Sequence, residues 1–191
     1  DLADITYIPI ETNNHVLINN GINALSHFSD KYIIIVNYKS YDCYIFDRNG
    51  KIINFFNHKG QGPNEYLNII GITADEVKKE IYIVDHPQKH RILVYSFDGD
   101  FIRTLSLPSN TTIGTIHNFD KETLLCEDNN HKNGNKKPYF LLSKQNGRII
   151  NELNIIFNKE RISQLFYQKT GEKGVMAVSY RYTPIIRFNE D

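Results

Sequence analysis

A threefold internal repeat constrains the fold of this chain more than any other feature of its sequence. Each copy contains a short apolar stretch, a polar turn, a second apolar stretch, a turn with glycine, and a third apolar stretch. The turn glycines are Gly50, Gly99 and Gly147, which are 49 and 48 residues apart. Four-stranded units with a period of about 40–50 residues are typical of the blades of a β-propeller.

The local chemistry of each repeat predicts strands joined by tight turns. Each turn glycine follows asparagine or aspartate, and such pairs tolerate the positive φ that hairpin turns need. β-branched and aromatic residues fill the apolar stretches, as in YIIIV (32–36) and IYIVD (81–85). One further strand candidate precedes each copy, at 23–29, 68–74 and 114–120. No long segment has the apolar period of an amphipathic helix.

The repeat therefore predicts an all-β fold, a β-propeller built of four-stranded antiparallel blades in a single, partial domain. About three and a half blades fit into the chain. The blades are expected near 21–57, 67–108 and 112–156, with an incomplete blade at 160–191 and a closing strand within 1–20. The incomplete blade has strand candidates at 162–168, 174–180 and 183–189. A β-sandwich is the structural alternative, but it does not require a regular period.

Composition argues against several functions. Lys+Arg and Asp+Glu both total 22, so the chain lacks the basic excess of a nucleic-acid-binding protein. No run of about 18 apolar residues is present, so no membrane span is expected. Cys43 and Cys126 belong to no CxxC motif, which argues against a zinc or redox site. The sequence is compatible with two free thiols and also with a disulfide between Cys43 and Cys126.

The stretch HKGQGPNEY (58–66) lies between the outer strand of the first blade and the inner strand of the second. It is therefore expected to be a corner that crosses from the rim to the centre. Gly60 and Gly62 permit positive φ, and Pro63 holds φ near about −65°. Glu65 is expected to accept hydrogen bonds from backbone amides that this irregular segment leaves unpaired. No Lys-Ser/Thr pair follows, which argues against a phosphate-binding loop.

Four residues are candidates for ligand binding. Glu65 or Tyr66 binds a ligand if the corner faces the central channel. His27 and His117 occupy comparable places on the expected inner strands of the first and third blades. Inner strands surround the channel, where Ca²⁺ or Zn²⁺ would find ligands, although no motif calls for a cofactor.

The segment DHPQKHR (85–91) contains two further histidines, His86 and His90. Their four-residue spacing would suit zinc on a helix, but here the segment is expected to be a turn between strands. We expect Asp85 to cap this turn and to pair with Arg91. Both residues thereby belong to the structural framework, together with Gly60, Gly62 and Pro63.

Two motifs carry a resemblance to known propellers. The stretch IYIVDHPQKHRILVYSFDG (81–99) resembles an NHL-type propeller repeat, although Lys89 replaces the usual asparagine. The opening ITYIPIETNNHVLI (5–18) and the element GQGPNEY (60–66) resemble the six-bladed β-propeller proteins of gut Bacteroides-type bacteria. Many of these are predicted lipoproteins of unknown function. The resemblance covers the whole chain.

This resemblance implies a ring of six blades and an extracytoplasmic location, in the periplasm or at the cell surface. It also implies a lipid anchor in the full-length precursor. A six-bladed ring needs about 300 residues at this period. We therefore expect either a longer native chain or a homodimer that forms through exposed blade flanks.

The leading functional hypothesis is a non-enzymatic, extracytoplasmic binding or scaffolding module. No Ser-His-Asp order, G-x-S-x-G motif or close carboxylate pair with supporting context is present. A protein or carbohydrate ligand would bind where loops converge, and the insertion NNHKNGNKK (129–137) is one candidate contact. The alternative is a lactonase-like hydrolase or lyase with a metal in the central channel, held by residues such as His27, His117 and Glu65.

Overall fold

The computed structural model describes residues 7–13, 16–18, 25–37, 39–85, 90–109, 111–128 and 138–154, and the backbone of 164–170 and 173–179. These residues form strands and turns and contain no helix, which confirms the all-β fold. The chain divides into two compact units, Asp1–Leu107 and Pro108–Asp191.

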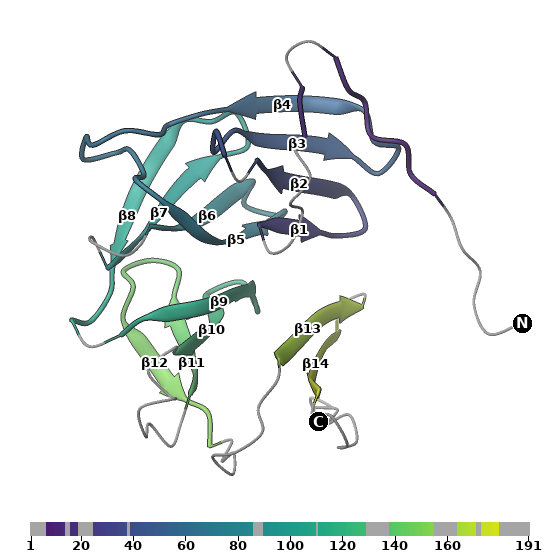
Figure 1. Ribbon diagram of the computed structural model, residues 1–191. Coiled ribbons are helices and arrows are strands. Elements are labelled where there is room, and N and C mark those ends of the chain that lie inside the picture. Colours follow the sequence, from purple (N-terminus) through teal and green to yellow (C-terminus); the bar gives the residue numbers. More distant parts are fainter. Residues whose placement is uncertain are drawn as a thin grey trace, which may run out of the picture. The chain divides into compact units, whose positions relative to one another are not determined.

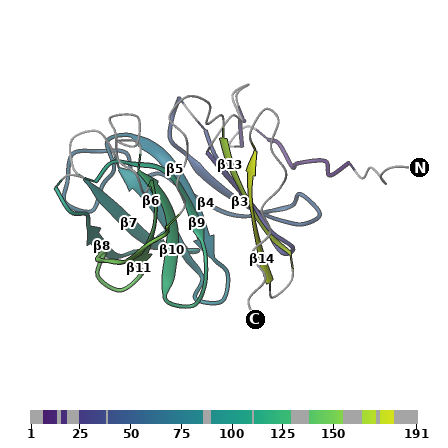
Figure 2. The ribbon, with the colours of Figure 1, turned by 90° about the horizontal axis from the view of Figure 1, so that it is seen from below.

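The first unit contains two four-stranded antiparallel sheets (Figure 1). Strands that are adjacent in sequence are adjacent in each sheet, so that both sheets are simple meanders. The first sheet consists of β1 (Ser26–Phe28), β2 (Tyr32–Val36), β3 (Cys43–Asp47) and β4 (Ile52–Phe56). The second consists of β5 (Ile69–Asp75), β6 (Glu80–Asp85), β7 (Arg91–Ser96) and β8 (Phe101–Ser106), whose order can also be followed in Figure 2.

The second unit contains a third meander and a hairpin. The meander consists of β9 (Ile113–Asn118), β10 (Thr123–Asp128), β11 (Tyr139–Ser143) and β12 (Ile149–Glu152). The hairpin consists of β13 (Gln164–Thr170) and β14 (Lys173–Ser179). The strand expected at 183–189 and the insertion at 129–137 lie outside the described residues.

Three four-stranded meanders with a regular period are the blades of a β-propeller. The predicted fold class is therefore confirmed, and the chain forms part of such a propeller. We refer to the three meanders as the first, second and third blades. The inner strands β1 and β5 pack side by side in the first unit. β1 is shorter than the strand expected at 23–29.

The hairpin turns have the predicted chemistry. The three turn glycines have φ of 80°, 92° and 74°, a region that favours glycine. At each turn, a side-chain oxygen accepts a hydrogen bond from the amide two residues later. Asp47 accepts from Asn49 at 2.8 Å, Ser96 from Asp98 at 3.1 Å, and Ser143 from Gln145 at 3.2 Å. These bonds form between residues two positions apart, so each turn is determined by its local sequence. This explains why the repeat can be recognised in the sequence.

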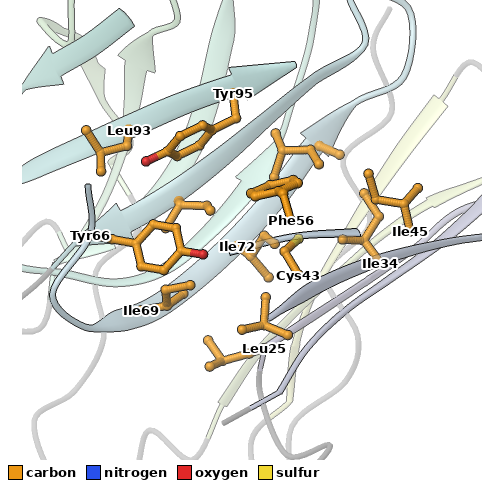
Figure 3. Close-up of a cluster of buried hydrophobic side chains, with 14 of the residues drawn as sticks. Leu25, Ile34, Cys43, Ile45, Phe56, Tyr66, Ile69, Ile72, Leu93 and Tyr95 are labelled. Carbon is orange, nitrogen blue, oxygen red and sulfur yellow. The ribbon is translucent and has the colours of Figure 1, made fainter. Parts of the chain in front are cut away.

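An apolar core joins the first blade to the second (Figure 3). Alternate residues of each central strand point to one face, so a blade between two neighbours buries both faces. The first blade contributes Ile34, Val36, Cys43, Ile45 and Phe56, and the second contributes Ile72, Ile81, Ile83, Leu93 and Tyr95. Cys43 and Cys126 are both free and buried, and burial raises the pKa of both thiols.

The opposite face of the first blade is covered by residues of the N-terminal stretches 7–13 and 16–18. Ile33, Ile35, Tyr44 and Phe46 form this face and are 0–4% exposed. They pack with Val16, and Ile8, Ile10 and Ile18 lie against the same cluster. The flank that the sequence led us to expect as exposed is therefore covered by Ile8, Ile10, Val16 and Ile18.

Truncation of Ile45 to alanine tests the core between the blades. Ile45 is 0% exposed, so Ile45→Ala is expected to lower the free energy of unfolding by about 2–5 kcal/mol. Ile53 lies on the neighbouring strand and is 52% exposed, so Ile53→Ala serves as the matched control and should cost about 1 kcal/mol or less. Urea unfolding measures both. Equal losses would show that the two blades do not share this core.

Candidate functional site

The corner at 58–66 closes on itself by backbone hydrogen bonds. The Gly60 amide donates to the Tyr66 carbonyl at 3.0 Å, and the Tyr66 amide donates to the His58 carbonyl at 3.0 Å. Within this frame, the Glu65 amide donates to the Gly62 carbonyl at 3.3 Å. The segment connects β4 with β5, so it leads from the outer strand of one blade to the inner strand of the next, as predicted.

The Glu65 carboxylate belongs to the corner itself. Its Oε2 accepts a hydrogen bond from the Gly62 amide at 2.8 Å, which confirms the predicted role. A Cβ atom at Gly60 would lie 2.0 Å from this oxygen, and one at Gly62 would lie 3.0 Å from it. Neither glycine has positive φ. The expectation that they supply positive φ was therefore wrong. Glycine is needed at these positions for another reason, because a side chain would crowd the Glu65 carboxylate.

Arg91 clamps the corner from the second blade. Its Nη1 donates to the Pro63 carbonyl at 2.6 Å, and its Nη2 donates to the Glu65 carbonyl at 2.5 Å. Its Nε donates to Asp85 Oδ2 at 2.9 Å, which confirms the predicted pair. The other oxygen of Asp85 accepts a hydrogen bond from the Leu67 amide at 3.0 Å. The pair thus holds both the corner and the start of β5.

Two tyrosines complete the framework, and both lie in the core (Figure 3). Tyr66 is 0% exposed, and its hydroxyl accepts from the His58 amide and donates to the Tyr41 carbonyl, both at 2.9 Å. The Tyr95 hydroxyl donates to the Asn64 carbonyl at 2.6 Å. Burial raises the pKa of both phenols, so they act as neutral donors. Tyr66 therefore packs in the core and does not face an open channel.

The side chain of His58 ties the corner to the second blade. Its ring stacks on Tyr95 at a centroid distance of 5.0 Å and an interplanar angle of 5°. Its Nε2 lies 2.7 Å from the Gly99 carbonyl. Because a carbonyl only accepts, this nitrogen carries the proton. His58 is thus held in one tautomer by packing and hydrogen bonding.

Sequence reasoning missed Tyr41, which adjoins the corner. Its φ of 63° is uncommon for a bulky residue, and the turn offers no glycine that would have drawn attention to it. Its hydroxyl donates to the Asn68 side chain, and its carbonyl accepts from Tyr66. The Lys59 ammonium lies 4.7 Å from the centre of its ring. These contacts hold the strained residue in place.

Exposed polar side chains surround this rigid frame. They are three amides and one ammonium, belonging to Asn57, Lys59, Gln61 and Asn64. We call this set the corner surface. Asn57 is oriented by hydrogen bonds from its Nδ2 to Asp42 at 2.7 Å and to the Ser40 carbonyl at 2.9 Å. The corner surface is thus built on fixed backbone, which suits binding more than chemistry.

His27 lies on β1, as predicted, and contacts the second blade. Its Nε2 is 3.9 Å from Glu76 Oε1, and its Nδ1 is 3.5 Å from Thr73 Oγ1. The order hydroxyl, imidazole, carboxylate resembles a catalytic triad in composition. Thr73 is only 2% exposed, however, so its hydroxyl is not available to a substrate. This cluster is therefore a contact between inner strands.

The predicted metal site receives no support from this cluster. A catalytic zinc site uses three protein ligands, and His27 with Glu76 supplies two. Within the described ranges, no group of three His, Cys, Asp or Glu residues is placed to hold a metal ion. His117 lies on β9, the counterpart of β1, but in the other compact unit. His90 is exposed in the turn before β7, and His86 lies outside the described residues.

Comparison with known proteins agrees with this architecture. A family model described as a domain of unknown function, DUF4934, matches residues 2–190. The chain belongs to the DUF4934 family. A search of curated proteins found no match. The predicted likeness to Bacteroides propeller proteins is confirmed for the fold, whereas the ring of six blades stays a prediction.

Two solved structures share the fold of this DUF4934 chain. One is a candidate exported protein from Bacteroides fragilis, with a TM-score of 0.70 and 19% identity over 97% of this chain and 52% of that one. The other is a DUF4221 family member from Bacteroides vulgatus, with a TM-score of 0.53 and 15% identity over 75% of this chain and 48% of that one. The chain thus spans about half the length of each. In the part of the chain that the structure describes, no helix is long and apolar enough to cross a membrane.

A double-mutant cycle tests the fit between Gly60 and Glu65. Gly60→Ala and Glu65→Ala should each lower the free energy of unfolding by about 1–3 kcal/mol, because each removes the hydrogen bond to the Gly62 amide. The double variant should cost little more than one single variant, since the same bond is lost. Urea unfolding of the four proteins gives the coupling energy. Additive losses would contradict the proposed fit.

The contact between His27 and Glu76 predicts a pH dependence. The neighbouring imidazole of His27, 3.9 Å away, lowers the pKa of Glu76 more than burial raises it. A lowered folded pKa stabilises the protein above the unfolded value of about 4.3, and this contribution disappears as the pH falls through the folded pKa. The parent should therefore lose more stability than Glu76→Gln between about pH 5 and 3. Thermal unfolding at each pH measures this. Parallel curves would contradict the contact.

Proposed function

We propose that this DUF4934 chain is a non-enzymatic, extracytoplasmic binding or scaffolding module that recognises its ligand at the corner surface. The supporting observation is that one set of side chains at the corner holds the backbone, while another set is exposed. Glu65, Tyr66, Asp85 and Arg91, four residues with acid, base or charge chemistry, are all engaged in holding the backbone. The exposed amides and the Lys59 ammonium then remain on a rigid frame.

The chemistry of the corner surface indicates the class of ligand. Amide groups donate and accept hydrogen bonds, and the Lys59 ammonium donates and carries a positive charge. A carbohydrate, or a protein loop with hydroxyl and carboxylate groups, matches these groups. The Tyr41 ring beneath Lys59 adds an aromatic surface at the same place. The zero net charge of the chain gives no reason to expect nucleic acid.

An extracytoplasmic location rests on family resemblance and on the fold shared with a candidate exported protein. Rigid propeller frames with binding loops suit a location where ligands are captured from the surroundings. Fractionation of the native cells tests this part separately. Recovery of the full-length protein with cytoplasmic markers would contradict it without affecting the corner surface.

Substitutions of Lys59 and Asn64 test the binding role. Ligands are first identified by screening the purified chain on glycan and protein arrays, and affinities are then measured by calorimetry. Lys59→Ala and Asn64→Ala should each weaken binding by about tenfold or more, as expected for the loss of about 1.4 kcal/mol of contact energy. Lys51→Ala, an exposed lysine at the β3–β4 turn, serves as the matched control.

The same assay can contradict the proposal in two ways. Unchanged affinity in both corner variants would place the ligand elsewhere. Chemical conversion of a bound ligand would show that the module is an enzyme, in line with the hydrolase or lyase alternative. In that case, metal analysis and the effect of His27→Ala on turnover would separate a channel metal from a metal-free reaction.

A further inference from the structure

The turn between β11 and β12 in the third blade is longer than its counterparts in the first two blades. In the first blade, the Asp47 amide donates to the Lys51 carbonyl, four positions on, at 2.9 Å, and the second blade has the same spacing. In the third blade, the Ser143 amide donates to the Arg148 carbonyl, five positions on, at 2.8 Å. The third turn therefore contains one additional residue.

The additional residue changes what the amide after the turn glycine binds. In the first blade, the Lys51 amide donates to Asp47 Oδ1 at 2.9 Å, and in the second blade the corresponding amide donates to Ser96 Oγ at 3.1 Å. In the third blade, the Arg148 amide donates to Oδ1 of Asn146 at 3.0 Å. Of these three amides, only the last binds the side chain directly before the glycine.

This hydrogen bond lies at a position with chemistry of its own. Asn146 directly precedes Gly147, and glycine has no side chain that would obstruct attack by its own amide nitrogen. If that nitrogen attacks the side-chain carbonyl carbon of Asn146, negative charge gathers on Oδ1. The Arg148 amide already donates to this oxygen, so it is placed as an oxyanion donor. The same bond orients the side-chain amide towards the backbone that follows it.

We propose that Asn146 is a site of spontaneous deamidation in the folded chain, whereas the equivalent Asn49 is protected. The Gly147 nitrogen loses its proton to water or hydroxide and forms a bond with Cγ of Asn146. The bond from Cγ to Nδ2 then breaks, ammonia leaves, and a succinimide remains. Water opens this ring and gives aspartate or isoaspartate. Water is the only co-reactant, and nothing is oxidised or reduced.

Asn49 is a close internal comparison, because the other determinants of the reaction are similar. Both asparagines are exposed and precede a glycine with positive φ. The Gly50 amide donates to the Asp47 carbonyl, and the Gly147 amide donates to the Ser143 carbonyl, both at 3.0 Å. The two attacking nitrogens are thus restrained alike. The difference between the turns lies in the donor to the side-chain oxygen.

The two products of deamidation differ in their effect on the turn. Asp98 directly precedes the turn glycine of the second blade, so aspartate is compatible with a turn of this kind. Isoaspartate adds a methylene group to the main chain between Ser143 and Arg148, whose hydrogen bond closes the turn. Both products add one negative charge. We therefore expect the isoaspartate form to weaken the hairpin more than the aspartate form.

Peptide mapping by mass spectrometry tests the site in the unmodified protein. The purified chain is incubated at mildly alkaline pH, folded or in urea, and chymotryptic peptides are analysed for conversion of the amide to an acid. In the folded chain, Asn146 should convert about tenfold faster than Asn49, since a donor in an exposed turn contributes less than one in a buried active site. In urea, the two rates should agree. The pairs at 20–21 and 133–134 also read Asn-Gly but lie outside the described residues, and they fall on separate peptides.

Arg148→Pro tests the donor, with Arg148→Ala as the matched control. Both variants remove the guanidinium, but only proline removes the amide that binds Asn146. Deamidation of Asn146 should slow towards the rate of Asn49 in Arg148→Pro and stay unchanged in Arg148→Ala. Circular dichroism shows whether each variant keeps its strands.

Two results would overturn the proposal. Equal rates at Asn146 and Asn49 in the folded parent would show that the third turn has no special reactivity. An unchanged rate in folded Arg148→Pro would show that mobility of the longer turn, and not the donor, sets the rate. If Arg148→Pro does not fold, the ratio of the two rates in the parent, folded against urea, still decides whether Asn146 is the site.

Discussion

The buried pair of Asp85 and Arg91 is the interaction on which the first unit depends most. Asp85 is 2% exposed and satisfies amides at the start of β5, while Arg91 satisfies carbonyls in the corner. The corner contains almost no β-ladder, so these bonds replace the regular pairing of a sheet. Loss of one partner leaves a buried charge without compensation, which typically costs about 3–5 kcal/mol.

The corner also shows why residues whose types suggest catalysis or binding can have a structural role. An irregular segment must satisfy its backbone groups with side chains, since it has no neighbouring strand to do so. Glu65, Tyr66 and Arg91 perform that task and have little capacity left for a ligand. In the proposed function, the ligand is contacted instead by exposed residues such as Lys59 and Asn64. These attract no attention in a sequence, because their value comes from the rigid frame beneath them.

The fold was predictable because its signals are local. Positive φ at Gly50 and the side-chain oxygen of Asp47 act within one turn, so the period could be read directly. The pair of Asp85 and Arg91 was predictable for the same reason, since the two residues are only six positions apart. The steric need for glycine at position 60 and the strained conformation of Tyr41 were not predictable. Each depends on how a particular side chain packs in three dimensions, which a spacing does not encode.

Among the described residues, the first and third blades do not repeat this clamp. Arg91 stands opposite Asp85 in the second blade. The residue opposite Asn37 is Asp42, and the residue opposite Asp128 is Pro138, neither of which has a guanidinium. Only this corner is therefore held by an arginine fork among the described blades. A preordered backbone loses less conformational entropy when it binds, so a ligand surface gains most where the frame is already fixed.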